Sequence, residues 1–83
     1  MKPMGNWTSV SQVMPKPEED VWAVIFDYGE GGFIHMIKAY CDHDGEWYDD
    51  DGRALVGTII YWQYIGDETE PSGLPPIPNV DWL

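Results

Sequence analysis

The densest group of side chains that could do chemistry lies between residues 42 and 51. Six of these ten residues carry a carboxylate: Asp42, Asp44, Glu46, Asp49, Asp50 and Asp51. Carboxylates at this density could ligate a cation, exchange protons with a substrate, or present negative charge to a basic partner. These three chemistries need different neighbours, so the rest of the sequence decides between them.

A calcium loop of the EF-hand type does not fit this stretch. Such a loop needs ligands at alternate positions, a glycine at the sixth position and a glutamate at the twelfth. Counted from Asp42, the sixth residue is Trp47 and the twelfth is Arg53; counted from Asp49, the fifth residue is already Arg53. The EF-hand fails in both registers and only an irregular cation site is left as an alternative. No metal and no cofactor are therefore predicted.

The two histidines and the single cysteine do not form a catalytic set. His35 lies in a strand-like pattern between Phe33 and Ile37, where a hydrogen-bonded structural histidine is expected. Cys41 lies near His43, but the surrounding carboxylates should raise the pKa of the thiol and disfavour the reactive thiolate. Neither histidine has an evident partner for acid–base work. We therefore expect a protein that is not an enzyme, with a small metal-dependent enzyme using the Asp-rich loop as the least favoured alternative.

The charge balance indicates the kind of partner. Fifteen acidic residues against four lysines and arginines give a net charge of −11 and an isoelectric point near 4.1. Such a chain repels nucleic acids and anionic membranes, so neither is expected to bind directly. The expected partner is a basic protein surface, such as one that normally binds the phosphates of DNA or RNA. The alternative is that the charge only keeps the domain soluble, with Asp and Gly favoured in two solvated turns.

The predicted contact region is Asp42–Asp51, with Trp47 and Tyr48 as its central anchors. Two smaller acidic clusters flank it in the sequence: Glu18, Glu19 and Asp20, and then Asp67, Glu68 and Glu70. Their electric field would be focused if all three met on one side of the molecule, which the sequence leaves open. The leading hypothesis is a non-enzymatic interaction protein that inhibits a nucleic-acid-binding or defence protein by mimicking the charge of nucleic acid. A structural or accessory module whose partner is neutral is the runner-up.

Alternating apolar residues and glycine-rich turns predict a β-sheet that positions the acidic region. Strands are predicted at Val21–Tyr28, Phe33–Cys41, Glu46–Tyr48 and Thr58–Ile65, with turns at Gly29–Gly32, Asp42–Gly45 and Asp49–Gly52. Both faces of Val21–Tyr28 are largely apolar, which predicts a central strand covered on two sides. Phe33–Cys41 also has fair helical propensity, but its place after a hairpin loop favours a strand. The predicted fold is mainly β, with α+β as the alternative: a small antiparallel meander of about four strands.

The chain is expected to form one domain over residues 1–83. Residues 1–20 form an irregular lead-in, residues 21–65 the sheet, and residues 66–83 an acidic and proline-rich strap. Residues 1–6 have no apolar segment typical of a signal peptide. The longest apolar stretches, Val21–Phe26 and Thr58–Trp62, are far shorter than the roughly 20 residues of a membrane helix. A lone cysteine fits a reducing compartment, so we expect a cytoplasmic protein.

Aromatic and proline landmarks run through the chain at Trp7, Val10, Pro15, Trp47, Tyr61–Trp62, Leu74–Pro76 and Pro78. Their order resembles a small uncharacterised domain family of bacteriophages and prophages, from Trp7 to Pro78. Tyr61 stands where that family has a histidine, and residues 65–73 intervene before the Leu-Pro segment. The family has no assigned activity. The resemblance implies a phage or prophage context, in which the protein would act in the host cytoplasm.

Overall fold

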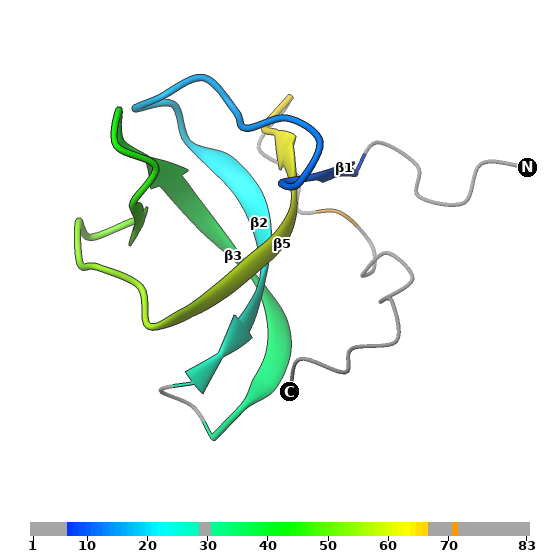
Figure 1. Cartoon of the computed structure of the whole chain (residues 1–83), viewed down its shortest axis with the longest axis vertical. Coiled ribbons are helices and arrows are strands. Elements are labelled where there is room, and N and C mark those ends of the chain that lie inside the picture. The colour runs from blue at the N-terminus through cyan, green and yellow to red at the C-terminus, as the bar shows by residue number, and fades with distance from the viewer. Residues whose placement is uncertain (1–6, 29–30, 67–70, 72–83) are drawn as a thin grey trace, which may run out of the picture.

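A computed structural model describes residues 7–28, 31–66 and 71. They form one antiparallel sheet of five strands in the order β1-β5-β2-β3-β4, shown in Figure 1. The strands are β1 (Thr8–Ser9), β2 (Val21–Asp27), β3 (Phe33–Cys41), β4 (Trp47–Asp49) and β5 (Gly57–Tyr64). The prediction of a mainly β, antiparallel fold is confirmed, and the helical alternative for Phe33–Cys41 is wrong. The predicted meander holds for β2, β3 and β4, whereas β5 lies between β1 and β2 and not beside β4. The strand beyond the predicted four is β1, a two-residue strand within the lead-in.

The alternation in β2 places its odd-numbered residues on the inner face of the sheet. Ala23 and Ile25 are fully buried there and pack with Ala39 and Ile59. Four partly buried side chains surround this core: Val10, Ile37, Trp47 and Leu55. Facing partners in an antiparallel pair share a face, so the register of Ala23 with Ile37 brings β3 into the same core.

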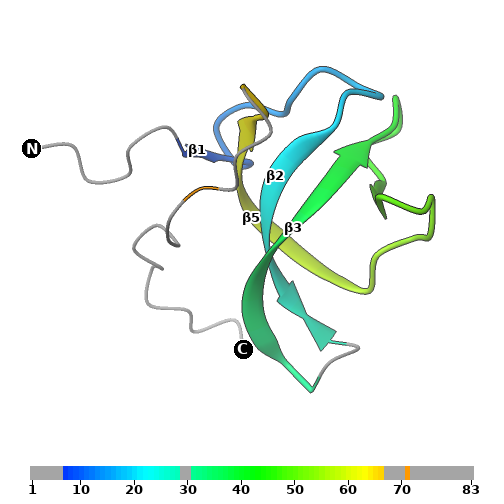
Figure 2. The same cartoon turned by 180° about the vertical axis from the view of Figure 1, so that it is seen from behind.

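The other face of β2 is covered as well, as its two-sided apolar pattern predicted. Val24 is fully buried and lies opposite Tyr61 of β5, which is also buried. Between Val24 and Ile25 the register with β5 shifts by a β-bulge, since Val24 faces Tyr61 whereas Ile25 faces Ile59. A bulge of this kind increases the local twist of the sheet. Figure 2 shows the resulting strong curvature of β2, β3 and β5.

The segment after β4 returns the chain to the sheet. Tyr48 pairs with Ala54, and Leu55 N donates to Trp47 O at 3.0 Å. One residue further, Val56 O accepts from Tyr28 N at 3.0 Å, and β5 then begins at Gly57. Residues 54–56 thus link the end of β4 to Tyr28, directly after β2, through hydrogen bonds.

Backbone groups of the lead-in bond to the sheet at several points beyond the pairing of β1 with β5. Trp62 Nε1 donates to Val13 O at 2.8 Å, and Lys16 N donates to the Tyr64 hydroxyl at 3.0 Å. Glu18 N donates to Cys41 O at 2.7 Å, at the end of β3. Of the predicted C-terminal strap, only residues 66 and 71 are described, so its docking lies outside the described residues. In the part of the chain that is described, no helix has the length and apolar character needed to cross a membrane.

Candidate functional site

Two turns with the same hydrogen bonds flank the three-residue strand β4. In the first turn, Asp42 Oδ1 accepts from the backbone N of Asp44 and of Glu46, both at 2.9 Å. The turn is completed by Asp42 N donating to Glu46 O at 2.9 Å and by Gly45 N donating to Asp42 O at 3.1 Å. Side chains of Asp favour such turns because their oxygens bond the backbone two residues further on.

The second turn repeats this arrangement seven residues later. Asp49 Oδ1 accepts from the backbone N of Asp51 and of Arg53, both at 2.9 Å. Asp49 N donates to Arg53 O and Gly52 N to Asp49 O, each at 2.9 Å. Gly45 and Gly52 have φ of 86° and 84°, which only glycine adopts without strain. The shared sequence Asp-x-Asp-Gly is the signal from which the repeat could have been recognised.

The carboxylate of Asp42 has a further role in the protein. It also accepts the hydroxyl of Tyr48 through Oδ2 at 3.1 Å. The hydrogen bond from Glu46 N is the chief cause that lowers the pKa of Asp42, with the Tyr48 hydroxyl and Asp44 N adding to it. The same bond to Asp42 raises the pKa of the Tyr48 phenol. Asp42 is therefore a structural carboxylate, in agreement with the turn interpretation of the acidic stretch.

Four carboxylates of the predicted contact region remain available to a partner. Asp44, Glu46, Asp50 and Asp51 are exposed. Within residues 7–28, 31–66 and 71, their side chains make no hydrogen bond and no ion pair. Their backbones are held by the two turns, so these charges project from ordered positions.

The first flanking cluster lies beside these turns. Glu18 N donates to the backbone O of Cys41, and Cys41 directly precedes Asp42. The side chains of Glu18, Glu19 and Asp20 are all exposed. We call the seven exposed carboxylates of the two regions the acidic rim: Glu18, Glu19, Asp20, Asp44, Glu46, Asp50 and Asp51. The structure thus brings the first flanking cluster next to the Asp42–Glu46 turn at the end of β3, whereas Asp50 and Asp51 lie at the other end of β4. The third, Asp67, Glu68 and Glu70, lies outside the described residues.

The two predicted aromatic anchors have partners within the fold. Trp47 is half-buried and packs against the hydrophobic core. Tyr48 is half-buried, stacks on Tyr40 with 5.4 Å between ring centroids, and donates to Asp42. Both rings therefore support β4 from within the sheet, and their predicted role in binding stays a prediction.

His35 is hydrogen-bonded, as expected of a structural histidine, and its partner is Asp27. Its Nε2 lies 2.8 Å from Asp27 Oδ2, and its ring lies 4.7 Å from that of Phe33. In the register of β2 and β3, Asp27 faces Phe33, so His35 follows two residues later on the same face. The contact is an ion pair when the imidazole is protonated. This pairing was overlooked in the sequence although the hairpin register predicts it.

Cys41 is a buried structural thiol. Its side chain is 1% exposed, and Sγ lies 3.8 Å from Pro15 O. Burial is the main cause that raises the pKa of Cys41, and the charges of Asp42 and Glu18 raise it further. The predicted direction is confirmed, with burial added to the effect of the carboxylates. Among the described residues, no group of three or more histidine, cysteine or acidic side chains could hold a metal ion.

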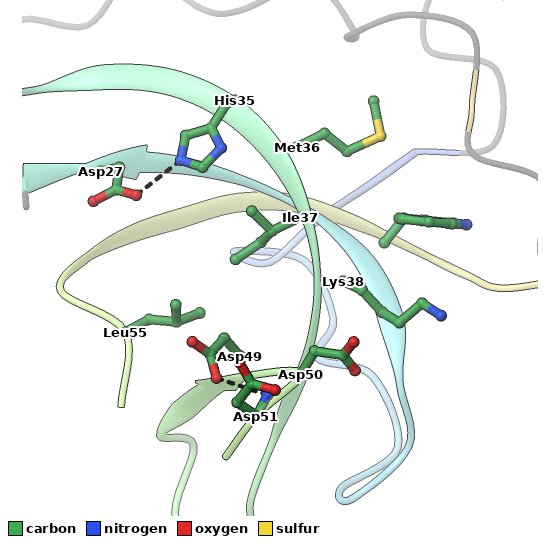
Figure 3. A pocket seen from close by; sticks show the side chains of 10 residues that line it. Asp27, His35, Met36, Ile37, Lys38, Asp49, Asp50, Asp51 and Leu55 are labelled. Atoms are coloured by element: carbon green, nitrogen blue, oxygen red, sulfur yellow. Dashed lines mark hydrogen bonds and ion pairs between the residues drawn. The ribbon is translucent and has the colours of Figure 1, made fainter. Parts of the chain in front are cut away.

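A groove of about 450 Å³ runs beside β3. Ile37 and Leu55 line its middle, the Asp49–Asp51 turn lies at one end, and the Asp27–His35 pair lies at the other. Figure 3 shows Ile37 between these two polar ends, with Met36 and Lys38 on the opposite side of the β3 ribbon. The groove therefore combines an apolar floor with carboxylates of the acidic rim.

No family model, no curated protein and no solved structure matches this chain. The resemblance to a phage domain family consequently stays a prediction, as do the non-enzymatic character and the host-cytoplasmic setting.

Proposed function

We propose that this chain is a non-enzymatic interaction protein whose acidic rim binds a basic surface of a nucleic-acid-binding protein and thereby inhibits it by taking the place of nucleic acid. The observation that carries the proposal is that some carboxylates form the turns whereas others are exposed to solvent. Asp42 and Asp49 hold the turns, whereas Asp44, Glu46, Asp50 and Asp51 are exposed beside them. If turn formation were the only use of the acidic residues, the four exposed positions would need no charge.

The spacing of the two turns also suits a row of lysines and arginines that binds phosphates. A three-residue strand advances about 10 Å, which is close to the rise of three base pairs along duplex DNA. A basic surface matched to phosphates at that spacing could contact both turns at once. Because exposed charges are screened by salt within roughly one Debye length, such binding is expected to be fast and sensitive to ionic strength.

A salt-dependent capture experiment tests this function. The immobilised chain is exposed to bacterial lysate at low salt, and bound proteins are then eluted with high salt or with duplex DNA. We expect basic nucleic-acid-binding proteins to be captured, and both eluants to release them. Capture that survives high salt and excess DNA would contradict mimicry and favour the accessory module with a neutral partner.

Two triple variants separate the position of the charge from its total amount. Asp44→Asn, Asp50→Asn and Asp51→Asn together remove three charges from the acidic rim without touching a turn carboxylate. Asp67→Asn, Glu68→Gln and Glu70→Gln remove the same number elsewhere in the chain. Each exposed pair contributes about 0.2–1 kcal/mol, so the rim variant should lose about tenfold in affinity. Equal losses in the two variants would show that the affinity does not depend on the acidic rim in particular.

A further inference from the structure

The groove beside β3 follows the side of that strand that β4 leaves unpaired. β4 pairs only with Ala39–Cys41, because Asp49 turns the chain away from β3. β3 itself begins six residues earlier, at Phe33. Among the described strands, none pairs with Phe33–Ile37 on the side opposite β2. A strand edge of this kind is a ready template for another extended chain.

Hydrogen bonds at both ends of β3 show which backbone groups face this edge. Asp42 N donates to Glu46 O, so the backbone of Asp42 points toward the β4 side. Backbone groups alternate along a strand, so those of Met36 and Ile34 point to the same side.

The opposite set of backbone groups points toward β2. Cys41 O accepts from Glu18 N on the β2 side, which assigns Ile37 and His35 to that side by the same alternation. Gly32 N donates to Asp27 O, so Asp27 and Ile25 of β2 face β3 and can pair with Phe33 and His35. This edge, with which no described strand pairs, therefore presents the N–H and C=O groups of Ile34 and Met36.

The side chains around this edge define what an added strand must carry. Ile37 and Leu55 offer an apolar floor on one face of the edge, and the exposed carboxylates of Asp50 and Asp51 lie at one end of the groove. The ammonium group of Lys38 is held over the Trp22 ring, 5.6 Å from its centroid, on the other side of the β3 ribbon from Ile37. Charge complementarity thus calls for a cationic segment that has apolar residues at alternate positions.

We infer that an extended basic segment of the partner protein adds to the sheet as a strand along Ile34 and Met36, in line with β4. Its backbone pairs with the free groups of these two residues, as in other cases of strand addition. One face of the segment places apolar side chains on Ile37 and Leu55. A lysine or arginine at its end meets Asp50 and Asp51. This inference rests on the proposed function and specifies how the partner is held.

Amide hydrogen exchange measured by NMR tests the inference, with an acetylated and amidated peptide of alternating arginine and valine as the probe. In the free chain the amides of Ile34 and Met36 should exchange quickly, whereas those of His35 and Ile37 are protected by β2. The peptide should slow exchange at Ile34 and Met36 by at least tenfold and leave His35 and Ile37 unchanged. The neighbouring amides of one strand thus serve as internal controls.

A proline variant gives a second measurement. Met36→Pro removes the backbone N–H that faces the edge. Edge strands tolerate proline where the N–H that is lost does not bond to a neighbouring strand. We expect at least tenfold weaker binding of the peptide by this variant, with the near-ultraviolet circular dichroism of the wild type retained. If the variant does not fold, the exchange pattern of the wild-type chain decides the question alone.

The possible failures are distinguishable. If the peptide binds in a salt-sensitive way but does not protect Ile34 and Met36, strand addition is wrong and the acidic-rim function survives. If the peptide does not bind and the rim triple variant captures as much protein as the wild type, both proposals are wrong. If Ile34 and Met36 are already protected in the free chain in a concentration-dependent manner, a second copy occupies the edge and the inference is overturned.

Discussion

Asp42 and Asp49 occupy equivalent positions in two turns at opposite ends of β4, and each carboxylate accepts two backbone N–H groups at 2.9 Å. β4 has only three residues, and Asp49 is the last of them. Short strands of this length have few ladder hydrogen bonds of their own, so the turns fix where the strand begins and ends. The turns formed by Asp42 and Asp49 therefore also fix the positions of the exposed carboxylates beside them.

Removing a turn carboxylate should therefore cost stability, and removing its exposed neighbour should not. Asp49→Ala leaves the N–H groups of Asp51 and Arg53 without their acceptor, which costs about 1 kcal/mol for the net loss of hydrogen bonding. For a domain of this size the Tm should fall by about 4–8 °C. Asp42→Ala should change the Tm in the same direction. Thermal denaturation followed by circular dichroism measures both.

Asp50→Ala is the matched control for Asp49→Ala. The Asp50 side chain is exposed and makes no hydrogen bond among the described residues, so its removal should change stability by less than about 0.5 kcal/mol. In the capture experiment Asp50→Ala should nevertheless bind less protein than the wild type. If Asp50→Ala destabilised the chain as much as Asp49→Ala, the assignment of the two roles would be wrong.

The lowered pKa of Asp42 predicts a specific dependence of stability on acid. The folded chain holds the pKa of this carboxyl below the unfolded value of about 3.9, chiefly through the hydrogen bond from Glu46 N. The contribution of Asp42 to stability is thus complete above about pH 3.9 and is lost as the pH falls through the lowered pKa. Asp42→Asn keeps an acceptor but cannot titrate, so the gap in Tm between wild type and variant should narrow in acid.

Tyr48→Phe tests the cause of this dependence. The variant removes the hydroxyl that donates to Asp42 Oδ2 while keeping the ring that stacks on Tyr40. The hydroxyl is one of the groups that lower the pKa of Asp42. The difference in Tm between the wild type and Tyr48→Phe should therefore also narrow in acid, but by less than the difference for Asp42→Asn. Unfolding curves measured across acidic pH distinguish the two variants. A gap that stays constant for Asp42→Asn would refute the role of Asp42.

The strands of this fold could be predicted because their patterns are local. β2 alternates two apolar faces, and a glycine-rich loop separates it from β3, which specifies an antiparallel pair. β1 is different, since two residues are too few for any period to be recognised. Its place is set by β5, where Thr8 faces Trp62 from more than fifty positions away. Pairing at such a distance depends on tertiary packing that the local sequence does not report.

The sequence predicts the region of the candidate site but not the roles of the individual carboxylates within it. The density of carboxylates at residues 42–51 is visible in the sequence, and so is the repeated Asp-x-Asp-Gly. The hydrogen bond from Tyr48 to Asp42 and the approach of Glu18 to Cys41 are not, because they depend on how β3 and β4 pair and on the path of the lead-in. Those contacts separate the carboxylates that hold the turns from those that face solvent.

Glu18 has a backbone conformation that favours glycine. Its φ is 70°, and it follows Pro17 in a turn in which Glu19 N donates to Lys16 O at 3.4 Å. A residue with a Cβ costs about 1–2 kcal/mol in this left-handed region of positive φ. Glycine avoids this strain, but its greater freedom in the unfolded chain offsets part of the gain. Glu18→Gly should therefore stabilise the chain by about 0.5–1 kcal/mol in chemical denaturation.

The same substitution should weaken partner binding, because it removes a carboxylate from the acidic rim. Glu18→Asn provides the comparison, since asparagine tolerates this region better than glutamate does and also lacks the charge. Both variants should gain stability and lose capture together. Gain of stability without any loss of capture would show that Glu18 takes no part in binding.

Gly57 begins β5 at a point where the backbones of two strands approach closely. A Cβ at this position would clash with Phe26 O and would lie 3.1 Å from both Cγ1 and Cδ1 of Ile25. Ile25 is fully buried in the core, so it has little freedom to move away. Overpacking of this kind costs about 1–3 kcal/mol, and a clash with backbone belongs to the upper part of that range. Gly57→Ala should accordingly lower the free energy of unfolding by about 2–3 kcal/mol, measured by urea denaturation.

Gly66→Ala is the matched control, because a Cβ there meets no atom within 4 Å, and it should leave the urea midpoint nearly unchanged. A similar loss for both variants would mean that the close approach of β5 to β2 at Gly57 is not what requires glycine.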